Sequence, residues 1–303
     1  MKTLKPVTWL ALFYSASLLM TVIVLWKSQT HGLSLQGRTP MIAIVSVEGP
    51  IRMGDSLGSA TNPRDLIKTL QKIEDNPRIR AVVIRINSPG GSVAAVQEIY
   101  GELNRLKSKG VILVTSMGDV AASGGYYLAA ATNRIVANPG TLTGSIGVIL
   151  ELANAEELLR KVGVRMETVK SGKFKDAGSP FRPLTAEEQR WFQGLIDQAY
   201  EQFVTAVCTG RHLSRKELAP LADGRVFTGE LAKEKKLVDV LGSEYDAIQE
   251  AKKLLGIPVD EKVPVQDMEA QSPLDRWLHL AGSAVPFNLK LTRPTQRFEY
   301  MWE

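Results

Sequence analysis

The sequence predicts an α/β protein with a mainly parallel sheet, preceded by one membrane-spanning helix. Short aliphatic and β-branched runs, such as Met41–Val47 and Ala81–Ile86, alternate with amphipathic stretches such as Val93–Lys109. Buried strands that alternate with helices are typical of parallel sheets covered by helices. A separate run without charged residues, Val7–Trp26, has the composition of a segment that crosses a bilayer.

The overall composition excludes several classes of protein. Of 303 residues, 44% are hydrophobic and 23% are charged, close to the averages of globular proteins, so neither a disordered nor a collagen-like chain is expected. The single cysteine, Cys208, excludes a disulfide framework and a cysteine-based metal cluster. Three histidines leave little material for a multi-histidine metal site, and a formal net charge of +5 is too mild to favour nucleic-acid binding.

The run Val7–Trp26 is predicted to be a transmembrane anchor. As a helix it would be about 30 Å long, which matches the hydrocarbon core of a bilayer. Trp9 and Trp26 lie near its two ends, where amphipathic rings favour the headgroup region. A cleaved signal peptide is the alternative, but the residues after Trp26 are bulky and polar instead of small.

Lys2 and Lys5 favour a cytoplasmic amino terminus, so we expect the rest of the chain on the extracytoplasmic side of the cell membrane. Lys27 and Arg38 weaken this charge asymmetry. The predicted organisation has four parts: an anchor over 1–27, a linker over 28–40, an α/β domain over 41–257 and an extension over 258–303.

The elements of the α/β domain follow from local signals. Asn62 and Pro63 open a helix, Gly110 ends another, Thr185 begins a third with acidic residues in its first turn, and Gly256 ends the last. The predicted strands are rich in aliphatic or β-branched residues and cover Met41–Val47, Ala81–Ile86, Val111–Thr115, Arg134–Ala137 and Met166–Lys170. The predicted helices are one opened by Asn62, Val93–Lys109, a short helix after Ser123, one in a strand–helix unit over Gly147–Val162, Thr185–Thr209 and Ser243–Leu255.

Two glycine-rich loops, Asn87–Ser92 and Ala121–Tyr127, lie between a predicted strand and a helix. The carboxyl ends of strands are where open α/β sheets bind ligands, and glycines there let backbone N–H groups approach an anion. Neither loop has a nucleotide-binding fingerprint, so an oxyanion is favoured over a phosphate. Tight turns without a function are the plain alternative.

Ser123, at the start of a helix in the second loop, is the candidate nucleophile. A serine hydroxyl needs a base to take its proton, and no histidine lies near these loops in the sequence, which leaves a histidine from a distant part of the sequence as one alternative. A lysine can serve when its surroundings favour the neutral amine. Three lysines, Lys170, Lys173 and Lys175, cluster after the strand predicted at 166–170, although solvated loop lysines would give the same pattern.

Four motifs occur in order: Ile86-Asn-Ser-Pro-Gly-Gly-Ser92, Ala122-Ser-Gly-Gly-Tyr-Tyr127, Thr143-Gly-Ser-Ile-Gly-Val148 and Ser171-Gly-Lys-Phe-Lys-Asp176. Together they resemble the bacterial signal peptide peptidases of the SppA type, over roughly Met41 to Gly256. The resemblance implies a membrane-anchored serine endopeptidase with the ClpP/crotonase fold of repeated ββα units.

The resemblance also implies the roles of individual residues. Ser123 falls on the nucleophile of the family, Lys175 on its general base, with Lys173 as the competing choice, and Ser145 on the serine that hydrogen-bonds the lysine. The backbone N–H groups of Gly90 and Gly124 fall on the oxyanion hole. No metal or organic cofactor is implied.

Members of this family degrade signal peptides left in the membrane. This chain looks like the short form, so the resemblance implies a ring-like homo-oligomer in which Ser123 pairs with Lys175 of a neighbouring subunit. The implied partners are signal peptides, other unfolded or membrane-proximal peptides and the lipid bilayer, without nucleic acid. The alternatives are a membrane quality-control protease of other substrates, a crotonase-type enzyme acting on acyl-CoA, and a non-catalytic scaffold with the same fold. Tyr126 and Tyr127 are expected to pack behind the nucleophile. Asp176 and Arg182 are expected to be solvated, with tuning of the charge of the lysine loop as the alternative.

Overall fold

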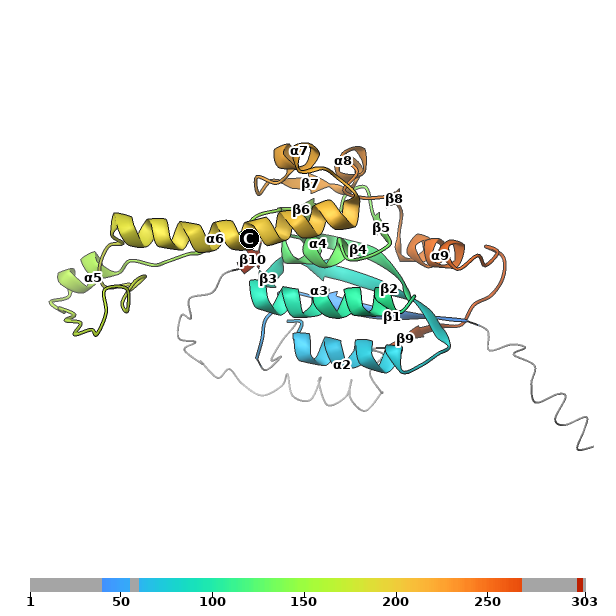
Figure 1. Cartoon of the computed structure of the whole chain (residues 1–303), viewed down its shortest axis with the longest axis horizontal. Coiled ribbons are helices and arrows are strands. Elements are labelled where there is room, and N and C mark those ends of the chain that lie inside the picture. The colour runs from blue at the N-terminus through green and yellow to red at the C-terminus, as the bar shows by residue number, and fades with distance from the viewer. Residues whose placement is uncertain (1–39, 55–59, 269–298, 302–303) are drawn as a thin grey trace, which may run out of the picture. The chain divides into compact units, whose positions relative to one another are not determined.

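Strands and helices alternate along the chain and form a mixed α/β fold (Figure 1). The computed structural model describes residues 40–54, 60–268 and 299–301. They belong to a unit that begins at Pro40. The predicted anchor, Val7–Trp26, lies outside these residues, and no helix among the described ones has the length and apolar composition needed to cross a bilayer.

The strands of the described residues are β1 (Met41–Glu48), β2 (Ile79–Ser88), β3 (Gly90–Ser92), β4 (Ile112–Ala122), β5 (Arg134–Ala137), β6 (Leu142–Gly144), β7 (Val226–Thr228), β8 (Val240–Leu241), β9 (Val265–Asp267) and β10 (Glu299–Met301). The helices are α2 (Pro63–Glu74), α3 (Val93–Ser108), α4 (Gly124–Ala129), α5 (Glu156–Lys161), α6 (Ala186–Arg211), α7 (Arg215–Leu218), the 3₁₀ turn η1 (Ala219–Leu221), α8 (Gly229–Glu234) and α9 (Glu244–Leu254).

The main sheet has the strand order β7-β6-β4-β2-β1-β9, with β5 paired to β4 and β8 to β5. Its pairs are parallel except β6 with β7. Helices α2 and α3 connect β1 to β2 and β2 to β4, so the three strands run in the same direction. The carboxyl ends of β2 and β4 therefore lie side by side at one edge, with Ser88 opposite Ala121.

Both faces of the sheet are covered. On one face Val82, Ile84 and Ile86 pack among residues of α2, α3, α4 and α6. On the other, Ala81 and Val83 pack against α9. Because alternate side chains of β2 enter different cores, the strand reads as a continuous apolar run, and each buried aliphatic side chain contributes about 1.5–3 kcal/mol.

The predicted elements up to residue 137 are confirmed, as are the long helix that begins after Thr185 and the last helix. Asn62 caps α2, and Thr185 and Glu188 form a capping box at α6. Strand β4 is longer than predicted and continues to Ala122. The sequence analysis did not predict β7, α8, β8 or β9.

Two predictions are wrong. Met166–Lys170 is not a strand, and the segment 147–162 contains only the short helix α5. These residues belong to an arm, residues 150–191, that extends beyond the sheet (Figure 1, yellow-green to yellow). A β-branched pattern forms a strand only where another strand supplies hydrogen bonds, and 166–170 is exposed without such a neighbour among the described residues.

Candidate active site

The two glycine-rich loops meet at the carboxyl edge of β2 and β4. A Cβ atom added to Gly124 would lie 3.1 Å from Cα of Gly90 and 2.7 Å from Cγ2 of Val96. A Cβ atom on Gly91 would lie 1.9 Å from the carbonyl oxygen of Ile51. Glycine is therefore required at both positions by close approach of the backbone, as the sequence analysis expected of a loop that binds an anion.

Gly90 adopts a φ of 110°, and its N–H donates to Oγ of Ser88 at 3.1 Å. Ser88 is fully buried at the end of β2. The sequence analysis assigned no role to this serine, although a hydroxyl at the end of a buried strand is a signal that could have drawn attention to it. The hydroxyl of Ser88 thus occupies the N–H that was predicted to help hold an oxyanion.

Ser123 combines a strained backbone with a buried hydroxyl that has no hydrogen-bond partner. Its φ is 51° and its ψ is −116°, its N–H donates to the carbonyl of Gly144 at 2.8 Å, and its side chain is 1% exposed. The Oγ atom has no partner among the described residues. Such strain and an unsatisfied buried hydroxyl each cost about 1–3 kcal/mol, and costs of this kind cluster at functional sites.

The helix that carries Ser123 at its start, α4, is fixed by its aromatic side chains. The hydroxyl of Tyr126 donates to the carbonyl of Leu237 at 2.9 Å, and burial raises the pKa of Tyr126, so it stays a donor. The ring of Tyr127 packs against Tyr100 and Phe203, each with a centroid distance of 4.8 Å. The predicted packing role of Tyr126 and Tyr127 is confirmed.

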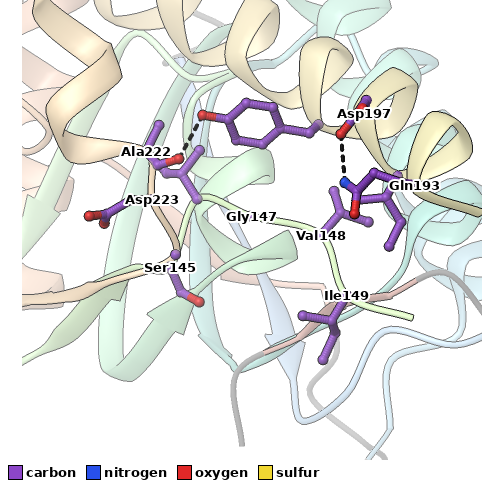
Figure 2. A pocket seen from close by; sticks show the side chains of 12 residues that line it. Ser145, Gly147, Val148, Ile149, Gln193, Asp197, Ala222 and Asp223 are labelled. Atoms are coloured by element: carbon purple, nitrogen blue, oxygen red, sulfur yellow. Dashed lines mark hydrogen bonds between the residues drawn. The ribbon is translucent and has the colours of Figure 1, made fainter. Parts of the chain in front are cut away.

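Ser145 lies close to Ser123 in the fold, because Ala122 pairs with Gly144 and each serine is the next residue. Its φ is 49°, and its N–H donates to the carbonyl of Arg225 at 2.9 Å. Ser145 lines a pocket of about 480 Å³ between the segment 145–149, α6 and the segment 222–224 (Figure 2). Ser123 is not among the residues that line it.

The three clustered lysines differ in their contacts. Lys170 donates to Oδ1 of Asp176 at 2.6 Å, and Lys173 pairs with Glu187 and lies 5.9 Å from the ring centre of Phe174. Lys175 is exposed, and within the described residues its amine has no hydrogen bond or ion pair. Lys175 is therefore the member of the cluster with a free amine.

Asp176 and Arg182 were expected to be solvated, and that expectation is wrong. Arg182 is hydrogen-bonded to both Asp176 and Glu188. The guanidinium, and next Lys170, hold the pKa of Asp176 well below its ordinary value. The same guanidinium, and next the N–H of Thr185, lower the pKa of Glu188 to about 2.

Within one chain the structure does not bring Lys175 to Ser123. The segment between α5 and α6, which contains Lys175, lies in the arm, well away from α4 (Figure 1). The hydroxyl of Ser123 accordingly lacks any described partner. In the part of the chain that the structure describes, no group of histidine, cysteine and acidic side chains could hold a metal ion.

A further strand contacts the first glycine loop. Strand β10 pairs antiparallel with β3, so that Glu299 lies opposite Ser92 and Met301 opposite Gly90 (Figure 1). The edge of β3 next to Gly90 is therefore able to hold an extended chain segment in antiparallel orientation.

Comparisons with known proteins agree with this geometry. A family model described as "Peptidase family S49" matches residues 105–258, and one described as "Clp protease" matches residues 43–141. A Synechocystis sp. protein, named only as a candidate protease, is 45% identical over 237 residues, which cover 78% of this chain and 82% of the relative.

Two further relatives carry more specific names. A protein of Enterococcus faecium, named as a candidate signal peptide peptidase SppA, is 38% identical over 192 residues, 63% of this chain and 56% of the relative. The Arabidopsis thaliana protein named "Serine protease SPPA, chloroplastic" is 36% identical over 245 residues, 79% of this chain but only 36% of the relative. The chain thus spans little more than half of the first of these two proteins and about a third of the second.

Proposed function

Since this chain belongs to peptidase family S49 and is a serine peptidase, we propose that it is a membrane-anchored endopeptidase that degrades cleaved signal peptides with a Ser123/Lys175 dyad. The observation that carries the proposal is the hydroxyl of Ser123, which is buried, strained and without a described partner. A hydroxyl in this state is able to receive a base that the described residues of one chain do not supply.

The proposed base comes from a neighbouring subunit of a homo-oligomer with the repeated ββα architecture of the ClpP/crotonase fold. Support comes from the arm, which carries Lys175 and a series of apolar side chains that one chain leaves exposed: Leu158, Val162, Val164, Met166, Val169, Phe174, Phe181, Leu184 and Trp191. Apolar surface of this extent is typical of an interface between proteins. A neighbour that covers it would also desolvate the amine of Lys175, which favours its neutral form.

In the proposed mechanism the amine of Lys175 accepts the proton of Ser123 as Oγ attacks the peptide carbonyl. The backbone N–H groups of Gly90 and Gly124 then hold the oxyanion, each donor contributing about 3–4 kcal/mol to the transition state. For this the N–H of Gly90 exchanges its bond to Ser88 for one to the substrate. Lys175 returns the proton to the leaving amine, and a water repeats the cycle on the acyl-enzyme.

Ser145 is proposed to form a hydrogen bond with the amine of the incoming lysine. Two features support this role: Ser145 lies close to Ser123, and its hydroxyl makes no hydrogen bond to the described residues. The substrate is proposed to lie extended along β3, an edge that already pairs with β10. The anchor, Val7–Trp26, would keep the catalytic domain near substrates that are embedded in lipid on the extracytoplasmic side.

The proposal is tested by mixing two inactive variants, Ser123→Ala and Lys175→Ala, that are purified separately as full-length chains. The assay is cleavage of a signal peptide in lipid vesicles. If the dyad forms between subunits, random reassembly of equal amounts restores about one quarter of the wild-type sites, because a site needs an intact serine and an intact lysine from two chains.

Two results contradict the proposal. Full activity of either variant alone would exclude that residue from the dyad. Recovery of no activity after subunit exchange, when exchange is verified with labelled chains, would exclude a dyad shared between subunits. If the enzyme cleaves unfolded soluble proteins but not the embedded signal peptide, the conclusion that it is a peptidase stands and signal peptides are excluded as its substrate.

A further inference from the structure

Arg182 makes forked contacts with two carboxylates at the same time. Its Nε and Nη2 atoms donate to Oδ2 and Oδ1 of Asp176 at 2.9 and 2.8 Å. Its Nη1 and Nη2 atoms donate to Oε2 and Oε1 of Glu188 at 2.9 and 2.5 Å. Bidentate contacts of a guanidinium with a carboxylate are the strongest and most directional ion pairs in proteins, so Arg182 links two points of the chain with defined geometry.

The two carboxylates belong to different structural units. Asp176 directly follows Lys175, and Nη2 of Arg182 also donates to its backbone carbonyl at 3.2 Å. Glu188 is 3% exposed in the first turn of α6, where its side chain accepts from the N–H of Thr185 at 2.9 Å. Through one guanidinium, the backbone next to Lys175 is tied to the capped start of a 26-residue helix.

Two other contacts join the loop to α6 in the described chain: Lys173 pairs with Glu187, and the rings of Phe174 and Trp191 have a centroid distance of 5.5 Å. Residues 162–183 contain no helix or strand, and most of their side chains are exposed. The remaining backbone bonds near Lys175 are short-range turns, such as its own N–H to the carbonyl of Gly172 at 3.1 Å. The side chains of those two contacts are exposed, whereas the pairs of Arg182 are forked and partly buried, so Arg182 makes the most directional link between the loop and α6.

The same contacts occupy the carboxylate beside the lysine. Oδ1 of Asp176 accepts from Lys170 and Arg182, and Oδ2 accepts from Arg182. The charge of Asp176 is thus paired with Lys170 and Arg182, and among the described residues Asp176 makes no ion pair with the neighbouring amine of Lys175. An ion pair of that kind would hold the amine in its protonated form, in which it cannot accept a proton.

We propose that Arg182 is a positioning residue for the reaction: it fixes the backbone at Lys175 relative to α6 and withholds Asp176 from the lysine amine. Arg182 acts through Lys175 and touches neither substrate nor Ser123. The inference rests on the proposed dyad, and its test separates the two.

The test compares Arg182→Gln with Arg190→Gln in the full-length assembled enzyme. Arg190 is a matched control, because it lies in the same arm, carries the same charge, is exposed, and donates only to the carbonyl of Ala186 within its own helix. For each variant kcat and KM are measured on a fluorogenic signal-peptide substrate, and the mass of the assembly is measured by light scattering.

Arg182→Gln is expected to lower kcat about 10- to 100-fold with KM changed less than about 3-fold, because a misplaced catalytic group slows the chemical step and not substrate binding. The assembly mass should equal that of the wild type. Arg182→Lys, which keeps the charge and loses the fork, should have an intermediate kcat. Arg190→Gln should match the wild type in every measurement.

A wild-type kcat in Arg182→Gln, a change confined to KM, or loss of activity together with loss of assembly would each overturn the positioning role. If Arg182→Gln fails to fold, Glu188→Gln breaks the link to α6 while Asp176 stays paired with Arg182, and a wild-type kcat there overturns the positioning role. Lys175→Ala, measured in parallel, identifies which proposal failed: an active Lys175→Ala removes the dyad, whereas an inactive Lys175→Ala with a fully active Arg182→Gln removes only the positioning role.

Discussion

The region around Ser123 and the arm that carries Lys175 differ in how far a single chain completes them. Ser123 is 1% exposed, and every residue of α4 behind it is buried. In the arm, no residue of α5 is buried and the side chain of Val169 is fully exposed. The serine half of the proposed site is therefore built by the core of one chain, whereas the lysine half is held in place by an ion-pair network.

The difference indicates that packing within one chain positions the serine, whereas the proposed assembly of subunits is needed to bring the lysine to it. A packed sheet edge can store the strain of Ser123 because the surrounding core determines its conformation. An exposed arm can present a lysine to another subunit because its own apolar side chains need cover. The following variants break or sharpen this contrast.

The largest effect is expected for Ser123→Ala. Its kcat should fall at least about 10⁴-fold, because the nucleophile is lost. Its melting temperature should equal or exceed that of the wild type, since the variant removes a buried hydroxyl without a partner. Kinetics and differential scanning calorimetry check this pair of outcomes, and a clear drop in melting temperature would show that the hydroxyl stabilises the fold instead.

Lys175→Ala and Lys173→Ala should differ strongly in activity. Loss of the free amine at 175 should lower kcat about 10²- to 10⁴-fold, the usual contribution of general acid–base catalysis. Lys173 pairs with Glu187, so its loss should change kcat less than about 3-fold, as for an exposed ion pair. Equal losses in the two variants, measured on the same peptide, would remove the distinction between these lysines.

Tyr126→Phe and Trp191→Ala should have opposite effects on stability and assembly. Tyr126→Phe leaves the buried carbonyl of Leu237 without its donor and should lower the free energy of unfolding by about 1–3 kcal/mol. Trp191 is 46% exposed in the arm, so Trp191→Ala should lower the free energy of unfolding by less than about 1 kcal/mol but weaken the assembly. Denaturant titration and sedimentation measure the two quantities, and a stable assembly of Trp191→Ala would count against the arm as an interface.

The smallest effect is expected from pH. Glu188 has a pKa of about 2 in the folded chain, below its ordinary value of 4.5, so its contribution to stability is fully present above pH 4.5 and is lost as the pH falls toward 2. The arm should therefore keep its structure through the neutral and mildly acidic range. The emission of Trp191, taken as the difference from Trp191→Phe, should be constant above about pH 5 and change only below it. A transition near neutral pH would contradict the ion-pair network at Arg182.

The sequence by itself determined much of the central fold. The spacing of apolar residues and the residues that begin or end helices predicted the elements from Met41 to Ala137. This succeeded because the strands in this region are buried on both faces of the sheet and therefore appear in the sequence as apolar runs. The family resemblance also implied that Gly90 and Gly124 act together, and the fold brings them close, since parallel strands end at one edge. Local signals at Asn62 and Thr185 were sufficient to predict where two helices begin.

Only the tertiary structure decided the rest. The residues Met166–Lys170 have a strand-like pattern, but no strand in the described part of the chain lies beside them, and the pattern itself does not reveal whether a neighbouring strand is present. The resemblance favoured Lys175 over Lys173, but only the fold decided that Lys170 and Lys173 have ion-pair partners and that Lys175 has none among the described residues. The proposed positioning role of Arg182 likewise depends on its contact with Glu188, which the sequence did not predict. The sequence gives the charge of a side chain, but the partner of that side chain depends on how the chain folds.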